Sequence, residues 1–387
     1  MKKFLSVFMA GVMACGMLTA CSGNSDSQAD GKVLYIGGSG PLTGDYATYG
    51  TSVKQGAELA MEEINAAGGV NGYTVYVRVE DDQADPQQAV SAYASLMDDG
   101  MNVSLGGTTS GACIAVSEEA YKDGLLMITP SGSQKECTQY DNGFRVCFQD
   151  PDQGKYAAKF IKDNNVGSKV AILYEKSNDY SVGIYENFAA TAEEVGLEVV
   201  TTQAFTDQSN QDFSVQLQAV KNSGADLLFM PFYAQQAAYV LTQADSMGLD
   251  VVFFGVDGMD GILEKIGREN QHLTEGVMLL TPFAASSAKE NVASFVNRYK
   301  AKYNAVPDQF AADAYDAVYA IVEAFKTAGV ETDDETFNEK MIAAMTQITV
   351  EGVTGTMQWT ADGEPNKEAT AVVIKDGAYV TYEDYTA

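Results

Sequence analysis

The chain has 387 residues, with 53 acidic residues against 24 lysines and arginines, and its formal net charge is −29. Such an acidic chain has no electrostatic attraction for nucleic acid or for an anionic bilayer, so both are excluded as charge-driven partners. Its length predicts two domains, and no segment beyond the N-terminal leader is apolar for long enough to cross a membrane.

The first residues are typical of a bacterial lipoprotein signal. Lys2 and Lys3 precede a short apolar run that ends in Leu-Thr-Ala-Cys at residues 18–21. This pattern predicts a signal peptide over 1–20 and a lipid on Cys21, the alternative being an ordinary signal peptide followed by a stray cysteine. Residues 21–32 are polar and predict a flexible tether. We therefore expect an extracytoplasmic protein, lipid-anchored to the bacterial cell membrane.

Short apolar strands alternate with amphipathic helices through the first part of the chain. In the helix predicted over 52–67, Ala57, Ala60 and Ile64 recur on one side at helical spacing, and Glu58 lies on the other. The other elements predicted here are strands over 33–38, 74–81, 102–107 and 125–130 and a helix over 85–100.

The same alternation then occurs a second time. Strands are predicted over 169–175, 198–205, 226–232 and 251–257, with helices over 180–196 and 212–224. Strands that alternate with helices form parallel sheets covered on both faces. Two such series predict an α/β fold with two doubly wound lobes.

The last third of the chain is expected to return to the first lobe and then to cross back. Helices are predicted over 289–303 and 309–328, followed by a short strand pair with Asp-Gly turns at 362–363 and 376–377. Three crossings between the lobes are expected near Asp150, Thr281 and Gly352. The lobe boundaries predicted in this way are 33–149 with 282–352 for lobe 1, and 150–281 with 353–387 for lobe 2.

The sequence lacks the motifs that catalysis or metal binding would need. The single histidine, His272, lies in a polar stretch without metal-ligand spacing around it, and no G-x-S-x-G motif occurs. The glycines of 37–44 do not form a phosphate loop, because Thr43 stands where the third glycine of G-x-G-x-x-G belongs. We therefore expect a binding protein without metal or cofactor, and not an enzyme.

A ligand site is predicted at the carboxyl ends of the strands, where ligands bind in open α/β sheets. Hydroxyl groups and a new helix N-terminus follow two strands of the first lobe, which suits a carboxylate. Two tyrosines and an acidic residue follow the strands of the second lobe, which suits an ammonium group. The residues concerned are Thr108, Thr109, Ser110, Ser131 and Ser133 in the first lobe, and Tyr180, Tyr233 and Asp257 in the second.

Three cysteines lie in the folded part of the chain. Cys137 and Cys147 are close in sequence, and an exported protein can hold a disulfide, so we predict a bridge between them. The alternative is three free buried thiols, and no role is predicted for Cys113.

The chain also resembles a known family, the branched-chain amino-acid-binding proteins among the type I periplasmic binding proteins of ABC importers. The resemblance covers nearly all of the chain after the leader, and it is most specific between Gly106 and Pro130. It rests on these segments: GSGPLTGDYATYG (38–50), INAAGGVNG (64–72), EDDQADPQQA (80–89), GGTTSGACIAVSEEAYKDGLLMITPSGS (106–133), NDYSVG (178–183), FGVDG (254–258) and QFAADAYDAV (309–318).

The resemblance implies roles for residues at matching positions. Ser110 matches the position whose hydroxyl and amide hold the ligand carboxylate, and Asp257 matches an acidic partner of the ammonium. Ser131 matches a position whose backbone carbonyl contacts the ammonium, and Ser133 matches one whose hydroxyl contacts both ends of the ligand. The aromatic lid and pocket walls of the family match Tyr180, Tyr233, Tyr49 and Phe310. Thr108 and Thr109 stand where leucine-selective members are more apolar, which departs from the family pattern.

Together these features predict a free aliphatic amino acid as ligand, with closure of the two lobes over it and delivery to the permease of an ABC importer. A buried zwitterion must find a partner for each of its charges, and the two lobes offer one each. The protein is expected to be a monomer. The alternatives are a smaller or more polar amino acid, an amide, urea or aromatic acid as cargo, and a ligand-sensing receptor domain.

Overall fold

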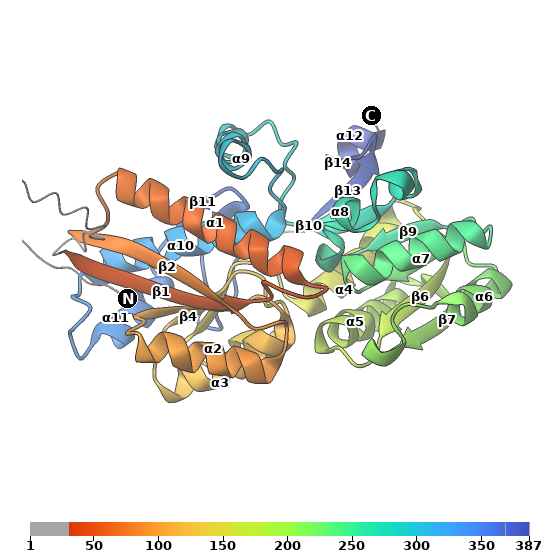
Figure 1. The fold of residues 1–387 in the computed structure, drawn as a ribbon. Coiled ribbons are helices and arrows are strands. Elements are labelled where there is room, and N and C mark those ends of the chain that lie inside the picture. Colours follow the sequence, from red (N-terminus) through yellow and green to blue (C-terminus); the bar gives the residue numbers. More distant parts are fainter. Residues whose placement is uncertain (1–30, 368, 387) are drawn as a thin grey trace, which may run out of the picture. The chain divides into compact units, whose positions relative to one another are not determined.

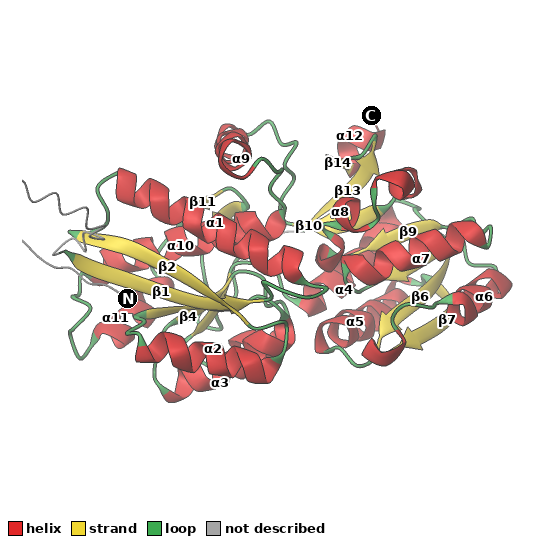
Figure 2. Cartoon of the chain, in the orientation of Figure 1, coloured by secondary structure: helices red, strands yellow, loops and turns green. Residues whose placement is uncertain are grey.

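The computed structural model describes residues 31–367 and 369–386. The predicted signal peptide and Cys21 lie outside the described residues. Lys32–Ala387 forms one compact unit that contains two separate β-sheets, each with helices on its faces (Figures 1 and 2). The predicted fold class, an α/β fold with two lobes, is confirmed.

The first sheet has five parallel strands in the order β2-β1-β3-β4-β5. Strand β1 lies inside the sheet and is buried from Leu34 onward, whereas β2 lies at an edge and alternates between buried and partly or fully exposed residues, as a half-covered strand does. The strands are β1 Lys32–Gly40, β2 Tyr73–Asp81, β3 Val103–Gly107, β4 Met127–Thr129 and β5 Gly143–Arg145.

The second sheet has seven strands in the order β14-β13-β10-β9-β8-β6-β7. Five of them are parallel, and an antiparallel hairpin extends the sheet beyond β10. Asp376 and Gly377 both have positive φ at the turn of this hairpin, as an Asp-Gly turn requires. The strands are β6 Lys169–Glu175, β7 Glu198–Phe205, β8 Leu227–Met230, β9 Val252–Gly255, β10 Met278–Thr281, β13 Thr370–Lys375 and β14 Ala378–Thr381.

Helices cover both faces of the two sheets (Figure 2). At the first sheet α1 packs against α10, and α2 packs against α3; at the second, α4 packs against α5 and α6 against α7. The helices are α1 Ala47–Ala66, α2 Pro86–Asp98, α3 Ser110–Lys122, α4 Asp150–Asp163, α5 Asp179–Val195, α6 Ser214–Ser223, α7 Ala234–Ser246, α8 Ile262–Lys265, α9 Glu290–Tyr303, α10 Gln309–Ala328, α11 Phe337–Met345 and α12 Tyr382–Thr386. Within the described ranges, no helix has the length and hydropathy of a membrane span.

Gly56 allows α1 and α10 to approach each other closely. A Cβ atom at this position would lie 2.0 Å from the backbone oxygen of Ala311 on α10, a distance that atoms do not reach. The contact matters for the rest of the molecule because both helices begin beside the cleft between the sheets.

The third crossing between the lobes comes later than predicted. Gly352 belongs to a small hairpin of β11 (Val350–Gly352) and β12 (Gly355–Met357), and residues as far as Glu364 still contact the first sheet. Trp359 donates its indole N–H to the Arg145 oxygen at 2.6 Å, and Arg145 donates its N–H to the Gly363 oxygen at 3.0 Å. The segment before β13 therefore lies with lobe 1, where we had predicted lobe 2, and it does not pair with β13 as the predicted strand pair requires. The other lobe boundaries stay predictions.

The predicted disulfide between Cys137 and Cys147 is wrong. Both residues carry free, buried thiols, as does Cys113. Cys137 lies in a 3-10 turn (Lys135–Thr138) that packs against α3, whereas Cys147 follows β5 outside the apolar cluster that contains Cys137. Closeness in sequence did not bring the two side chains together.

Candidate ligand-binding site

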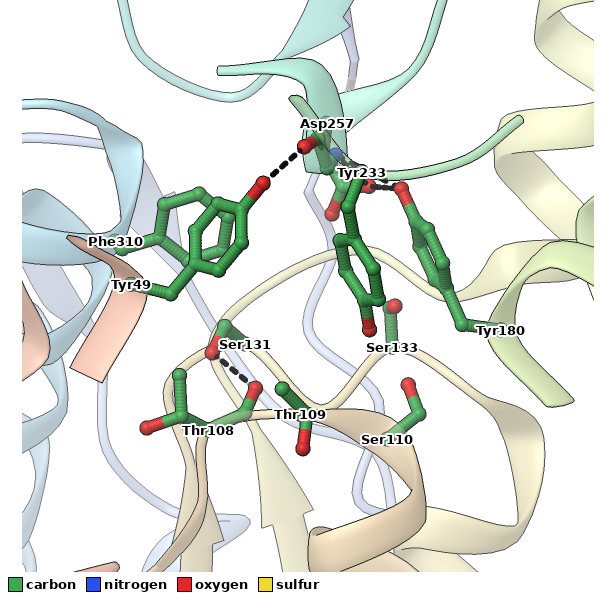
Figure 3. A pocket seen from close by; sticks show the side chains of 11 residues that line it. Tyr49, Thr108, Thr109, Ser110, Ser131, Ser133, Tyr180, Tyr233, Asp257 and Phe310 are labelled. Atoms are coloured by element: carbon green, nitrogen blue, oxygen red, sulfur yellow. Dashed lines mark hydrogen bonds between the residues drawn. The ribbon is translucent and has the colours of Figure 1, made fainter. Parts of the chain in front are cut away.

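The loops that follow the strands of both sheets meet around one cavity (Figure 3). The empty space between its lining atoms is about 270 Å³, and part of this space is open to solvent. All ten residues predicted for the site line it, together with Gly258, which the sequence did not single out. The ten are Tyr49, Thr108, Thr109, Ser110, Ser131, Ser133, Tyr180, Tyr233, Asp257 and Phe310.

Asp257 provides a carboxylate on the second-lobe side of the cavity. It follows β9 and is 4% exposed. Its carboxylate accepts hydrogen bonds from the Tyr180 hydroxyl and from the Gly258 N–H at 2.8 Å. Burial raises the pKa of Asp257 to about 6, and the hydrogen bonds from Tyr180 and Gln153 oppose that rise. None of the hydrogen-bond partners described for this carboxylate is a cation, so an ammonium group would supply the missing counter-charge.

A second buried carboxyl group, that of Asp150, lies behind Ser133. Asp150 opens α4 and is fully buried, and its N–H donates to the Ser133 backbone oxygen at 2.9 Å. One oxygen of its carboxyl group accepts from the Gln153 amide at 3.4 Å, and the other has no partner among the described residues. Burial, and then the nearby charge of Asp257, raise the pKa of Asp150 well above its ordinary value. Sequence reasoning placed only a crossing between the lobes here. The available signal was an acidic residue opening a helix directly after the last strand of the first sheet.

The first-lobe side of the cavity offers hydroxyl groups and the N-terminus of α3. No side chain caps this helix, because the Thr109 hydroxyl has no partner among the described residues. The first N–H groups of α3 are therefore available to an anion. The Ser110 hydroxyl oxygen accepts from the Gln134 N–H at 3.2 Å, which joins α3 to the loop that carries Ser133. This end of the cavity can hold a carboxylate.

The hydroxyls of Ser131 and Thr108 are hydrogen-bonded within the protein. Ser131 donates to the Thr108 oxygen at 2.7 Å, and Thr108 donates to the Ser39 oxygen at 3.1 Å. Figure 3 shows the hydroxyl oxygens of both threonines pointing away from the rings of Tyr49 and Tyr233. The two threonines therefore make the pocket less polar than their presence in the sequence suggests.

Four aromatic rings form the wall between the two polar ends. Tyr180 and Tyr233 are stacked, with ring centres 5.0 Å apart and planes 9° from parallel. Tyr49 lies 5.4 Å from Tyr233 and 4.6 Å from Phe310, also between ring centres. This continuous apolar surface suits an aliphatic group.

Tyr49 also joins the two lobes across the cavity. Its hydroxyl donates to the Gly258 oxygen at 2.7 Å and accepts from the Ala234 N–H at 3.0 Å (Figure 3 shows the first of these bonds). Tyr49 belongs to α1 beside the first sheet, whereas Ala234 and Gly258 follow strands of the second. The structure therefore shows the lobes closed on each other.

Arg145 holds the loop that carries Ser131 and Ser133. This fully buried guanidinium donates to the Gly132 oxygen at 2.8 Å, to the Gln134 oxygen at 3.1 Å and to the Thr138 hydroxyl at 2.8 Å. Its charge is paired with Glu364 at 3.0 Å, from the segment before the third crossing. Sequence reasoning missed Arg145, because nothing in the local pattern shows that it lies under the loop.

The family of the chain is evident from comparison with known proteins. A family model described as "Periplasmic binding protein" matches residues 33–378. A leucine-, isoleucine-, valine-, threonine- and alanine-binding protein of Pseudomonas aeruginosa is 30% identical over 92% of this chain and 96% of its own length. A Leu/Ile/Val-binding protein homologue of Brucella melitensis is also 30% identical, over 86% of this chain and 88% of its own.

Solved structures agree with this assignment. The substrate-binding protein of a branched-chain amino acid transporter from Streptococcus pneumoniae, in complex with isoleucine, is 29% identical to this chain. It superposes with a TM-score of 0.82 over 90% of this chain and 98% of its own. A leucine-binding protein from Thermotoga maritima is 26% identical and has a TM-score of 0.80, over 91% of this chain and 99% of its own. The chain belongs to the periplasmic binding protein family.

Proposed function

We propose that this protein is the extracytoplasmic substrate-binding subunit of an ABC importer and that it binds a free aliphatic L-amino acid, with branched-chain side chains preferred. One observation carries the proposal: an anion-binding end at α3 and Ser110 and a buried carboxylate at Asp257 lie on opposite sides of one cavity with an aromatic wall. A zwitterion of one amino acid meets a partner for each charge there.

The nature of the side-chain pocket supports an aliphatic rather than a polar cargo. The rings of Tyr49, Tyr233 and Phe310 form its wall, and the Thr108 hydroxyl is bonded elsewhere. The relatives named for leucine, isoleucine and valine support the same class of ligand. An aromatic acid or an amide would bring no ammonium group and would leave Asp257 without a counter-charge.

The test is a thermal-shift and calorimetry series with matched ligands. Leucine, isoleucine and valine at a hundred times their dissociation constants should each add about 2.7 kcal/mol to the free energy of unfolding. The 2-oxo acid of leucine has the same side chain and carboxylate but no ammonium, and it should bind at least roughly twentyfold more weakly. Equal binding of leucine and its oxo acid would refute the zwitterion site. If only alanine, serine or threonine stabilises the protein, the ligand is one of the smaller amino acids and not a branched-chain one.

Binding is proposed to proceed by closure of the lobes. The ligand docks first on the Ser110 and Ser133 side, and Tyr180, Tyr233 and Asp257 then cover it from the second lobe. The closed form is the one that the permease would recognise, so the ligand acts by shifting the population toward it. The protein is proposed to act as a monomer.

Attachment to the membrane through a lipid on Cys21 is part of the same proposal, supported by the Leu-Thr-Ala-Cys sequence at 18–21. Fractionation of cells that express Cys21→Ser should recover the protein away from the membrane, whereas the unchanged chain sediments with it. Membrane association that survives this substitution would rule out the lipid anchor.

A further inference from the structure

Two of the buried cysteines are neighbours in space, although they are far apart in sequence. Cys113 lies in the first turn of α3, and Cys137 lies in the 3-10 turn Lys135–Thr138, which packs directly against α3. Both are fully buried in one apolar cluster, and each has a free thiol.

The Cys137 thiol contacts α3 within one turn of Cys113. The Cys137 thiol lies 3.7 Å from the backbone oxygen of Ser110, which is three residues before Cys113 and therefore on the same side of α3. Each of the two thiols also shifts the pKa of the other. Within the described residues, no other cysteine is among the groups that influence Cys147, whose pKa is raised well above its ordinary value by burial, with the charge of Arg145 opposing the rise.

The surroundings of Cys113 favour its thiolate. The neighbouring Cys137 thiol lowers the pKa of Cys113, and burial opposes this shift. The Thr129 hydroxyl, the Gly107 N–H and the charge of Arg145 also lower it. The thiolate is the form that attacks a disulfide. Cys113 is therefore the more reactive of the two, since burial raises the pKa of Cys137.

We propose that Cys113 and Cys137 form a disulfide in the exported protein, by exchange with a dithiol–disulfide oxidoreductase or a small disulfide such as oxidised glutathione. The Cys113 thiolate attacks one sulfur of the oxidant and releases the other as a thiolate. Cys137, deprotonated, then displaces the oxidant from the mixed disulfide. The protein loses two protons and two electrons, and the disulfide of the oxidant becomes two thiols. The exchange occurs once α3 and the 3-10 turn are in contact but before the rest of the lobe covers the two sulfurs, which are buried in the folded chain.

The bridge would support the ligand site. Ser110 and Cys113 share one turn of α3, and Cys137 follows the loop that carries Ser133 by four residues. Cys113 also lies beneath that loop, since a Cβ atom at Gly132 would be 2.7 Å from its sulfur. A covalent link between α3 and the 3-10 turn therefore fixes the two hydroxyl-bearing segments relative to each other.

Peptide mapping of the full exported chain tests the proposal. Free thiols are blocked with N-ethylmaleimide in denaturant, and the unreduced protein is cut with trypsin. Cleavage after Lys122, Lys135 and Arg145 places each of the three cysteines in a separate peptide. The expected products are a linked pair of the peptides 79–122 and 136–145, and an alkylated peptide 146–155.

Two variants make the result decisive. Cys147→Ala should keep the linked pair, and Cys113→Ser should abolish it and leave Cys137 alkylated. Reduction should lower the melting temperature of Cys147→Ala by roughly 5 °C and leave that of Cys113→Ser unchanged. A link between 136–145 and 146–155 would overturn the proposal. So would alkylation of all three cysteines, both in the exported chain and after refolding in a mixture of reduced and oxidised glutathione.

Discussion

In the closed form that the structure shows, burial raises the pKa of Asp257 to about 6, and the ionisation of this carboxyl group controls the proposed binding of an ammonium group. A bound ammonium favours the charged carboxylate and therefore lowers the pKa of Asp257. Below about pH 6, ligand binding therefore releases a proton. The affinity for leucine should therefore fall with falling pH below about 6, by up to roughly tenfold per pH unit, and should be level above pH 7. Calorimetric titrations between about pH 7.5 and pH 5 measure this dependence.

The Asp257→Asn protein is the matched control for this titration. At neutral pH it should bind leucine more weakly by about 2–5 kcal/mol, because the ammonium loses its buried partner. Its pH dependence should be reduced to what other carboxyl groups near the site contribute, Asp150 among them. Its melting temperature without ligand should be unchanged or higher, since a buried carboxylate without a counter-charge has been removed. Equal pH slopes in the two proteins would assign the titration to another group.

Residues of the site could be predicted from the sequence where strand ends decide their position. Ser110, Ser133 and Asp257 follow strands whose carboxyl ends meet at one cleft, and that rule needs no knowledge of packing. Asp150 and Arg145 could not be found in this way. Their importance depends on which loop lies above them, and only tertiary contacts determine that.

At the scale of elements, α1 and α10 carry two walls of the cavity, Tyr49 and Phe310, and Gly56 sets the distance between these helices. Gly56→Ala should force the helices apart and lower the free energy of unfolding by about 1–3 kcal/mol. The affinity for leucine should fall as well, since Tyr49 and Phe310 move with their helices. Chemical denaturation and calorimetry measure the two effects.

Lys54→Ala is the matched control on the same helix. Its side chain is partly exposed, and its only described ion pair, with Glu58, is long at 3.9 Å. Such a pair contributes little, so both stability and affinity should stay close to those of the unchanged protein. A Gly56→Ala protein that behaved like this control would show that the helix contact tolerates a methyl group.

The predicted elements and their order agree with the structure over most of the chain, because hydrophobic periodicity is a local property. The third crossing between the lobes was predicted at the wrong place, because its position depends on contacts between residues that are far apart in sequence. The segment up to Glu364 stays with the first lobe through Trp359 and Arg145, and neither contact leaves a periodic pattern in the sequence. The disulfide prediction failed similarly, since sequence spacing fixes the length of a loop but not the directions of its cysteines.

For the whole molecule, the Tyr49 hydroxyl bonds to Ala234 and Gly258 only when the lobes are closed. Tyr49→Phe should therefore destabilise the closed form and not the open one, and weaken leucine binding by about 1–2 kcal/mol. The loss should appear mainly as faster dissociation in stopped-flow measurements.

Tyr303→Phe controls for the loss of a tyrosine hydroxyl as such. The Tyr303 hydroxyl donates to the Gln55 oxygen at 3.0 Å, and both residues belong to helices of the first lobe. Its removal should leave dissociation of leucine unchanged. Similar dissociation rates for Tyr49→Phe and Tyr303→Phe would show that the contact across the cavity does not hold the lobes together.

The burial of Asp257 has a consequence for the transport cycle under the proposed function. Closing the lobes without cargo removes an acidic group from water and gives it no positive partner, which costs free energy. The ligand-free protein therefore closes less readily. Since the closed form is the one that the permease would recognise, the importer would hydrolyse less ATP without transporting a substrate. The Asp257 carboxylate, which would bind the ammonium of the amino acid, would therefore also reduce ATP hydrolysis that is not coupled to transport.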